Sequence, residues 1–216
     1  MYTRVKKLNK SEDIYARIKE MIVTGKFGPG EELTEIELSN LFGASRTPIR
    51  NALAKLSADG LVDFTPNKGC NVSKVTYKFA CQMIDARTAL EAYAFTACCR
   101  KKDADVIARL YQMISEQQKC FNSGDTEGFI EQDMLFHMCI VESLGNPTWL
   151  SFWKNVMDHI RRIMTTCLEK PEIRESAISV HRSLVRCIMH GDEKTGSEIL
   201  TSHFDDLRED FATTIS

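Results

Sequence analysis

The sequence predicts a mainly α-helical protein built from two modules. Apolar residues recur at helical spacing through most of the 216 residues. The alternation of period two that is typical of strands is confined to two short stretches, LVDF and CNVSKV, between residues 61 and 75. The charge is unevenly divided, because residues 1–76 hold 12 Lys and Arg against 9 Asp and Glu, whereas residues 77–216 hold 16 against 21. A mildly basic N-terminal part, the front module, and an acidic C-terminal part, the back module, indicate that the two modules have different partners.

The overall composition is that of a globular protein, with 43% hydrophobic and 27% charged residues. No run approaches the ~18 apolar residues that a membrane span needs. The charged start, MYTRVKKLNK, lacks the apolar segment of a signal peptide. We therefore expect a cytoplasmic protein with no membrane partner. Its eight cysteines are expected to be reduced and buried, because none forms a C-x-x-C pair.

The front module, residues 1–72, begins with two helices. The first lies within SEDIYARIKEMIVTGKF, which places three isoleucines on one face and offers Ser11 as an N-terminal cap. The stretch GPGEEL then predicts a turn. The second helix, TEIELSNLFG, opens with a capping box, in which Thr34 and Glu37 stand three residues apart.

The third helix of this module, SRTPIRNALAKLSADG, carries the residues that indicate a function. Ser45 is a good N-terminal cap, and apolar residues at helical spacing define an inward face. The opposite side of the first turns presents a cationic, hydrogen-bonding surface formed by Arg46, Thr47, Arg50 and Asn51. Two short helices, a tight turn and a third helix with such an N-terminus are the components of a helix-turn-helix, which binds DNA.

The two strand-like stretches follow this helix and are joined by TPNKG, so they predict a hairpin, or wing, with Lys68 at its tip. On a lone helix, Arg46 and Arg50 would be read as a solvated charged face. The ordered set of helices, basic helix end and basic-tipped hairpin favours DNA binding instead.

The stretch LTEIELSNLFGASRTPIRNALAKLSADGLVDFTPNKGCNV resembles the winged helix-turn-helix of the GntR family of bacterial transcriptional regulators. The resemblance implies operator contacts from five matching positions, Arg46, Thr47, Arg50, Lys68 and Gly69. The second helix departs from the family pattern, because Glu35 and Ile36 stand where many relatives have an arginine or another polar residue. The resemblance therefore does not support phosphate contacts from that helix.

The back module, residues 77–216, shows no strand alternation, which predicts an all-α bundle of six or seven helices. Polar, glycine and proline breaks separate helical segments near 77–100, 103–122, 126–143, 148–167, 174–190 and 193–212.

Four polar residues fall on the inward, apolar faces of three of these helices: Asp133, His137, His181 and His203. Burying a neutral polar group without a partner costs ~1–3 kcal/mol, and a carboxylate costs more. Asp133 and His137 could satisfy each other as i,i+4 neighbours, but this pairing leaves the other two histidines without partners. A divalent metal ion bound by one carboxylate and three imidazoles removes all four penalties together.

The stretches MIDARTALEAYAFTAC, DMLFHMCIVESLGNP, VHRSLVRCIMHGD and LTSHFDDL resemble the FCD-type ligand-binding domain of the FadR subfamily. The resemblance implies that these four residues bind zinc or a similar ion, with nickel, manganese or iron as alternatives. One or two coordination positions would stay open for water or an effector carboxylate. Arg87 matches an arginine that faces the effector cavity, and the alternative for it is a local pair with Glu91 at i+4. Asn155 is a weaker candidate for the same cavity.

Together these features predict a DNA-binding transcriptional regulator, acting as a repressor and controlled by a small carboxylate effector at the metal site. We expect a homodimer on a palindromic operator, because one module offers few base contacts. One alternative is a metal sensor, in which the ion itself is the signal. Another is a metal-dependent hydrolase, but we find no convincing general base beside the four residues and expect no enzymatic activity.

Overall fold

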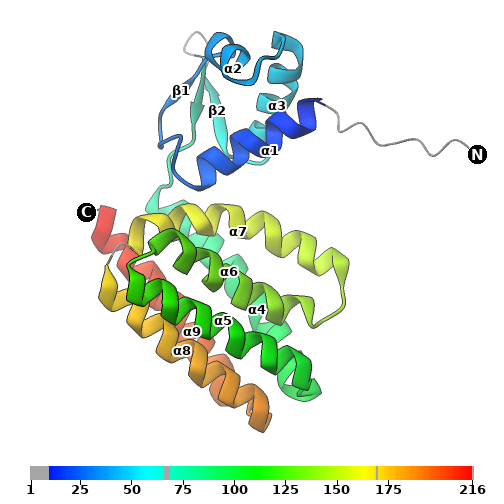
Figure 1. The fold of residues 1–216 in the computed structure, drawn as a ribbon, viewed down its shortest axis with the longest axis vertical. Helices are drawn as coiled ribbons and strands as arrows, with labels where there is room; N and C mark the ends of the chain where they lie inside the picture. The colour runs from blue at the N-terminus through cyan, green and yellow to red at the C-terminus, as the bar shows by residue number, and fades with distance from the viewer. Residues whose placement is uncertain (1–9, 66–68, 169, 216) are drawn as a thin grey trace, which may run out of the picture. The chain divides into compact units, whose positions relative to one another are not determined.

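The computed structural model describes residues 10–65, 69–168 and 170–215 (Figure 1). These residues form nine α-helices and one three-stranded sheet. This confirms the prediction of a mainly α protein in which a winged helix-turn-helix precedes a helical bundle. The chain divides into two compact units, Met1–Val75 and Thr76–Ser216.

Three helices build the N-terminal unit: α1 (Lys10–Val23), α2 (Glu35–Phe42) and α3 (Arg46–Ala58). The apolar faces of all three contribute to one buried core, in which Ile18, Ile49 and Leu56 are completely buried. Because these faces are buried, the opposite side of α3 faces solvent, as helical periodicity requires.

The helix ends of this unit differ in part from the predictions. Thr34 caps α2 as predicted, because its hydroxyl oxygen accepts a hydrogen bond from the backbone nitrogen of Glu37 at 3.2 Å. The prediction that Ser11 caps α1 was wrong, because the helix already includes Lys10. The Ser11 hydroxyl instead donates to the carbonyl oxygen of Pro48 at 3.3 Å, which ties the start of α1 to the first turn of α3.

The sheet is antiparallel, in the order β1-β3-β2, and its strands are β1 (Glu32–Leu33), β2 (Val62–Thr65) and β3 (Gly69–Val72). The β2–β3 hairpin is the predicted wing, and its tip, residues 66–68, lies outside the described residues. The strand β1 corrects the prediction of a simple turn in GPGEEL. Two residues are too few to show alternation, and the strand exists because the backbone of Val72 exchanges hydrogen bonds with Gly30 and Glu31.

Six helices build the C-terminal unit: α4 (Tyr77–Lys101), α5 (Ala104–Ser123), α6 (Thr126–Glu142), α7 (Pro147–Cys167), α8 (Pro171–His190) and α9 (Glu193–Ile215). Each predicted helix is present, with ends that differ by up to three residues. The largest differences are at the start of α8 and at the end of α9. The helix α8 begins at Pro171 because proline fits the first helical turn.

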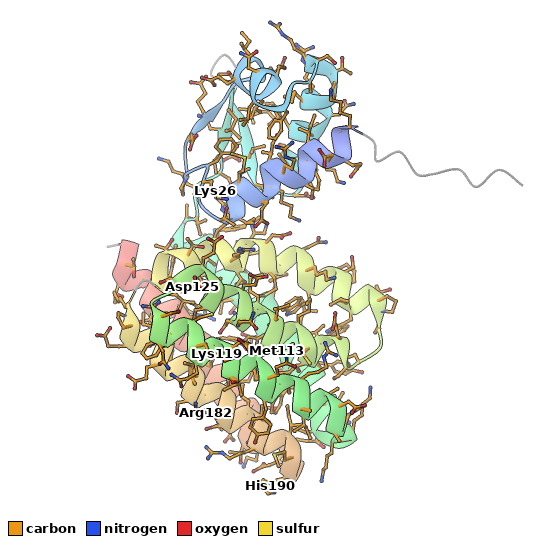
Figure 2. All side chains as sticks on the ribbon, viewed as in Figure 1. Lys26, Met113, Lys119, Asp125, Arg182 and His190 are labelled. Atoms are coloured by element: carbon orange, nitrogen blue, oxygen red, sulfur yellow. The ribbon has the colours of Figure 1, made fainter. Side chains whose placement is uncertain are left out.

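The six helices form one bundle around a shared core (Figure 1). The helix α4 packs against α6, α7, α8 and α9, and α5 packs against α6 and α8. Large side chains such as Phe95, Phe136, Trp153 and Phe204 fill the interior, whereas Arg182 and His190 extend from the outer side of α8 (Figure 2). No helix among the described residues is long and apolar enough to cross a membrane.

Candidate metal centre and DNA-binding surface

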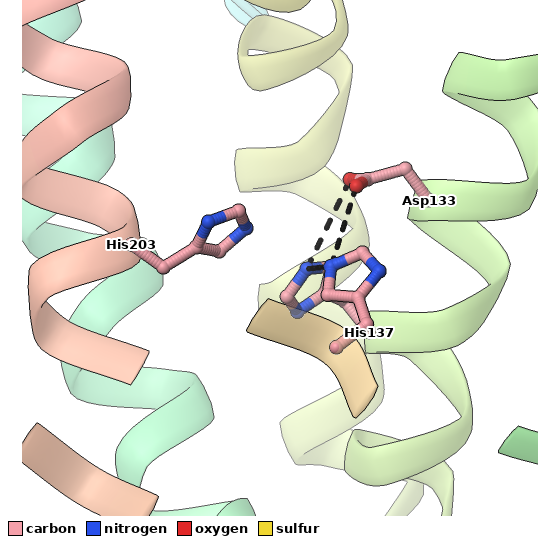
Figure 3. A group of neighbouring side chains, drawn as sticks. Asp133, His137 and His203 are labelled. Carbon is pink, nitrogen blue, oxygen red and sulfur yellow. Dashed lines mark hydrogen bonds and ion pairs between the residues drawn. The ribbon is translucent and has the colours of Figure 1, made fainter. Parts of the chain in front are cut away.

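Four side chains meet inside the helical bundle. Asp133 and His137 lie on α6, His181 lies on α8 and His203 lies on α9, and one ligand atom of each lies within 4.8 Å of the others. Figure 3 shows His203 directed from α9 toward the two residues of α6. The residues from α6 and α8 are buried, and His203 is partly buried. The bundle therefore brings together the four residues that the sequence singled out.

The ring of His137 is oriented by a buried carboxylate on α4. Its Nδ1 atom lies 2.6 Å from Oε2 of Glu91. Burial by itself would raise the pKa of Glu91, but the charges of Arg87 and His137 and the hydrogen bonds from His137 and Trp153 lower that pKa to about 2. The Glu91 carboxylate is therefore ionised and can only accept, so Nδ1 of His137 carries the hydrogen. In the neutral ring, the lone pair of Nε2 then points into the centre.

The ring of His181 is oriented in the same manner by Gln117 of α5. Gln117 Nε2 donates to Oδ1 of Asp133 at 3.4 Å, so its Oε1 accepts from Nδ1 of His181, 2.8 Å away. The Nε2 atom of His181 therefore also presents a lone pair to the centre. Burial, followed by the charges of His137 and His203, holds the pKa of His181 well below 6.5, which keeps this ring neutral.

The Nε2 atoms of His137 and His181 lie 3.2 Å apart, at hydrogen-bond distance. When His137 is protonated, its Nε2 donates to the lone pair of His181, and when His137 is neutral, both nitrogens present lone pairs. Two nitrogens bound to one tetrahedral zinc ion at ~2.05 Å would lie about 3.3 Å apart. A divalent cation would take the place of the hydrogen between the two rings and bind both nitrogens. The residues present therefore fit a metal ion of the kind that takes imidazole and carboxylate ligands.

Asp133 completes the set from the turn of α6 that precedes His137. Its carboxylate oxygens lie 3.5 Å from Nε2 of His181 and 3.9 Å from Nε2 of His137. The second contact is the local Asp133–His137 pair considered from the sequence, and it is an ion pair when His137 is protonated, although it is too long for a hydrogen bond. Burial raises the pKa of Asp133, and the charges of His137 and Arg87 oppose this effect. A bound cation would stabilise the ionised carboxylate.

The sequence did not reveal the two residues that orient the histidine rings, Glu91 and Gln117. Glu91 is completely buried and accepts hydrogen bonds from Arg87 Nε and Trp153 Nε1, both at 2.8 Å, in addition to its contact with His137. Gln117, also completely buried, was not considered. The available signal was a carboxylate and an amide on apolar helix faces, but neither pattern alone indicates which histidine is the partner.

A cavity of about 310 Å³ adjoins the centre, and Arg87, Asp133 and His203 are among the residues that line it. Arg87 is 1% exposed, and both of its predicted roles are compatible with its position. Its Nε atom pairs with Glu91, whereas its Nη2 atom has no hydrogen-bond partner among the described residues and lies 3.9 Å from Asp133 Oδ2. Asn155 does not belong to this cavity. It lies on the exposed side of α7, because the neighbouring Trp153 and Met157 occupy the buried face.

The predicted DNA-binding residues of α3 share one exposed face: Ser45, Arg46, Thr47, Arg50 and Asn51. Ser45 occupies the N-cap position, but its side chain makes no capping hydrogen bond. Hydrogen-bond donors at the start of α3 therefore remain available for an anion such as a phosphate. Gly69 begins β3, and Lys68 lies outside the described residues.

Arg50 is partly engaged within the N-terminal unit. Its Nε atom lies 2.6 Å from Oε1 of Glu35, the acidic residue at the start of α2. The Arg50 side chain is nevertheless 64% exposed, so its remaining N–H donors are accessible from solvent. This ion pair gives a structural role to the residue at which the sequence departs from the family pattern.

Comparisons with known proteins agree with this architecture. Residues 10–72 match the bacterial regulatory proteins of the gntR family, and residues 82–206 match the FCD domain. The transcriptional repressor GlaR of Escherichia coli K12 is 27% identical over 204 residues, which cover 89% of this chain and 91% of GlaR. The gluconate operon transcriptional repressor of Bacillus licheniformis is 24% identical over 200 residues, covering 90% of this chain and 82% of that protein.

Solved structures share the fold. The E. coli protein McbR/YncC superposes with a TM-score of 0.82 at 19% identity, covering 97% of this chain and 100% of that one. Fold and sequence thus define a DNA-binding transcriptional regulator with a helical C-terminal domain. The chain belongs to the gntR family of bacterial regulators, in the group that carries an FCD domain. Its relatives are regulators and not enzymes, which confirms the expectation that it is not a hydrolase.

Proposed function

We propose that this protein is a cytoplasmic, homodimeric repressor whose affinity for a palindromic operator is controlled by a small carboxylate at a metal ion in the helical bundle. Zinc is the ion that we favour. The observation that carries the metal is the 3.2 Å separation of the Nε2 atoms of His137 and His181, two rings whose Nδ1 atoms are both engaged by partners outside the centre.

Asp133, His137, His181 and His203 would hold the ion. Four protein ligands leave one or two positions open if the ion expands beyond four-coordination, and a carboxylate oxygen is a suitable ligand there. When bound, the ion supplies a Lewis acid that attracts an anion. Arg87 lines the same cavity, and its Nη2 atom, which has no hydrogen-bond partner among the described residues, would supply a charge-assisted hydrogen bond to that anion.

The exposed face of α3 would read the operator, with Arg46 and Arg50 as donors to base edges or phosphates. A second copy of the chain would supply the second half-site, because one recognition helix contacts few base pairs. The effector changes DNA affinity only to the extent that it binds two conformations of the protein with different affinity.

DNA binding by the full-length protein tests this function. A duplex selected from a random library by the wild-type protein serves as the probe, and fluorescence anisotropy is measured with metal-free protein, zinc-loaded protein and zinc-loaded protein with a panel of small acids. We expect an acid to change the affinity of the zinc-loaded protein alone, and His137→Ala to bind DNA without responding.

The same experiment separates the metal-sensor alternative. If zinc by itself switches DNA binding and no acid alters it further, the ion is the signal and the carboxylate is not an effector. If neither zinc nor any acid changes DNA binding, the proposed control at this site is wrong.

A further inference from the structure

The cavity beside the candidate metal centre has two chemically different ends. Its inner end is formed by the buried residues Arg87 and Asp133 together with His203. Its outer end lies between the first turns of α8 and the last turns of α9, and four acidic residues line it there: Glu172, Asp206, Glu209 and Asp210. Apolar side chains, among them Met164, Leu168 and Ile173, also line the cavity. A ligand that fills the cavity therefore meets the Arg87 guanidinium group, and the metal ion where one is bound, at the inner end and carboxylates at the outer end.

None of the four outer carboxylates forms a close ion pair or a side-chain hydrogen bond with another described residue. The nearby Arg208 is directed elsewhere, because it pairs with Asp85 at 2.7 Å and with Asp205 at 3.5 Å. Lys170 acts on Asp210 through its charge, without a close contact. Negative charge therefore exceeds positive charge at the mouth of the cavity.

The local sequence makes this arrangement unfavourable for α9 itself. Asp206 and Asp210 stand at i,i+4 on one helix face, where like charges destabilise a helix. Burial raises the pKa of Asp210, the charge of Lys170 lowers it, and the smaller effects of Asp206 and Glu209 raise it, with a net rise. Glu172 has a separate role in the first turn of α8, where a carboxylate favours the helix dipole. The carboxylates of α9 have no such local explanation.

An independent observation indicates a ligand at the inner end. Arg87 lines the cavity, and its buried Nη2 atom has no hydrogen-bond partner among the described residues, with the Asp133 carboxylate 3.9 Å away. A buried guanidinium group with a free donor is costly unless an acceptor reaches it. An anionic group of a bound molecule would be that acceptor.

We propose that the effector of this protein is zwitterionic: its carboxylate binds at Arg87 and the metal, and an ammonium group at its other end binds among Asp206, Glu209, Asp210 and Glu172. The chemical class is an amino acid or an amino-substituted acid. This inference rests on the proposed control by a carboxylate at the metal centre. A dicarboxylate is disfavoured, because its second carboxylate would face four others at the mouth, and an uncharged tail would leave the acidic end without a partner.

Matched probe molecules test the proposal with zinc-loaded, full-length protein. Straight-chain acids of four to eight carbons are compared in three forms, with a terminal methyl, carboxylate or ammonium group, as in hexanoate, adipate and 6-aminohexanoate. 1,6-Diaminohexane tests an amine without a carboxylate. Isothermal titration calorimetry measures each dissociation constant. We expect the amino acid of the best-fitting length to bind about tenfold tighter than its methyl counterpart, with the dicarboxylate weakest.

Two double variants of α9 locate the effect. Asp206→Asn/Asp210→Asn should abolish the preference for the ammonium form and leave binding of the methyl form within about twofold. Glu198→Gln/Asp205→Asn removes the same charge from exposed positions of α9 that do not line the cavity, and should retain the preference. Circular dichroism melting confirms that both variants are folded.

The outcomes separate this inference from the proposed function. If the methyl or dicarboxylate form binds as tightly as the amino acid, or if the diamine does, the zwitterion proposal is overturned while the binding of an acid still supports a carboxylate effector. If no acid of any form binds the zinc-loaded protein, the proposed function fails and this inference fails with it.

Discussion

The Nε2 atoms of His137 and His181 lie 3.2 Å apart inside the helical bundle, close to the separation of two nitrogens that bind one metal ion. Glu91 and Gln117 impose this arrangement, because each accepts the Nδ1 hydrogen of one ring. The two imidazoles are thus oriented as metal ligands by residues that do not themselves belong to the four. Such outer hydrogen bonds fix the tautomer and the direction of a ligating histidine.

Metal binding should stabilise the protein. A ligand that binds only the folded state at 1,000 times its dissociation constant adds ~4 kcal/mol to the free energy of unfolding. We expect thermal melting of zinc-loaded protein at a clearly higher temperature than after chelation, and no such difference for His137→Ala. His190→Ala is the matched control, because His190 is exposed at the end of α8. A normal zinc-dependent shift in His137→Ala would contradict the site.

Glu91→Gln should weaken both the metal centre and the fold. The variant leaves the buried Arg87 without its charged partner, and breaking a buried ion pair costs about 3–5 kcal/mol. It also replaces the charged acceptor that polarises His137 with a neutral amide, and loss of such a partner lowers metal affinity about 10–100-fold. Urea unfolding and competition with a chelating dye measure the two effects.

The matched control for this change is Glu193→Gln. It breaks an arginine–glutamate pair of similar length, 2.9 Å to Arg100, but in an exposed position, where such pairs contribute about 0.2–1 kcal/mol. Equal losses of stability in the two variants would argue that Glu91 has no special role.

The metal-free protein should lose stability as the pH falls below about 6.5. Burial and neighbouring charges lower the pKa of His203 to about 3 and hold the pKa of His181 well below 6.5. The unfolded chain therefore binds more protons than the folded chain between these values, so the free energy of unfolding rises with pH there, by up to about 1.4 kcal/mol per pH unit for each imidazole. Urea unfolding of chelated protein at several pH values measures this slope.

Two other buried groups change the free energy of unfolding at lower pH. Glu91, with its pKa of about 2, adds a loss of stability in acid, and Asp133, whose pKa is raised, acts in the opposite sense. Metal should suppress the histidine slope near neutral pH because it competes with protons for the imidazole nitrogens. A chelated protein whose stability is constant between pH 5 and 6.5 would show that the rings are not buried as neutral groups.

The DNA-binding face should respond to Glu35 as well as to the arginines. Arg46→Ala or Arg50→Ala should weaken operator binding by about 1–3 kcal/mol. Glu35→Gln should release Arg50, raise affinity for random-sequence DNA and steepen the dependence of log affinity on log salt by about 1. Anisotropy titrations at several salt concentrations measure both quantities.

Glu12→Gln is the control for the salt effect, because it breaks an exposed 2.8 Å pair with Lys55, beyond the first turns of α3. If Glu35→Gln and Glu12→Gln change the salt dependence equally, the Glu35–Arg50 pair has no specific influence on DNA binding.

Much of the fold could be predicted because its signals are local. Helical periodicity, caps such as Thr34 and breaks at glycine and proline located every helix of the bundle to within a few residues. The two-residue strand β1 could not be predicted, because it exists only through backbone hydrogen bonds to β3, about 40 residues further along the chain. Asn155 was misplaced for a related reason, since a flank position on α7 turns out to face solvent.

The sequence by itself determined the helix-turn-helix, the exposed donors of α3 and the inward direction of Asp133, His137, His181 and His203, because a period of 3.6 residues fixes the side of a helix on which a residue lies. Only the tertiary structure decided that Glu91 orients His137 and that Gln117 orients His181, across 46 and 64 residues of sequence. It also decided that Arg87 keeps a free donor at the cavity and that the acidic residues of α9 line its mouth. Periodicity specifies a face, whereas the packing of helices against one another specifies which faces meet and at what distance.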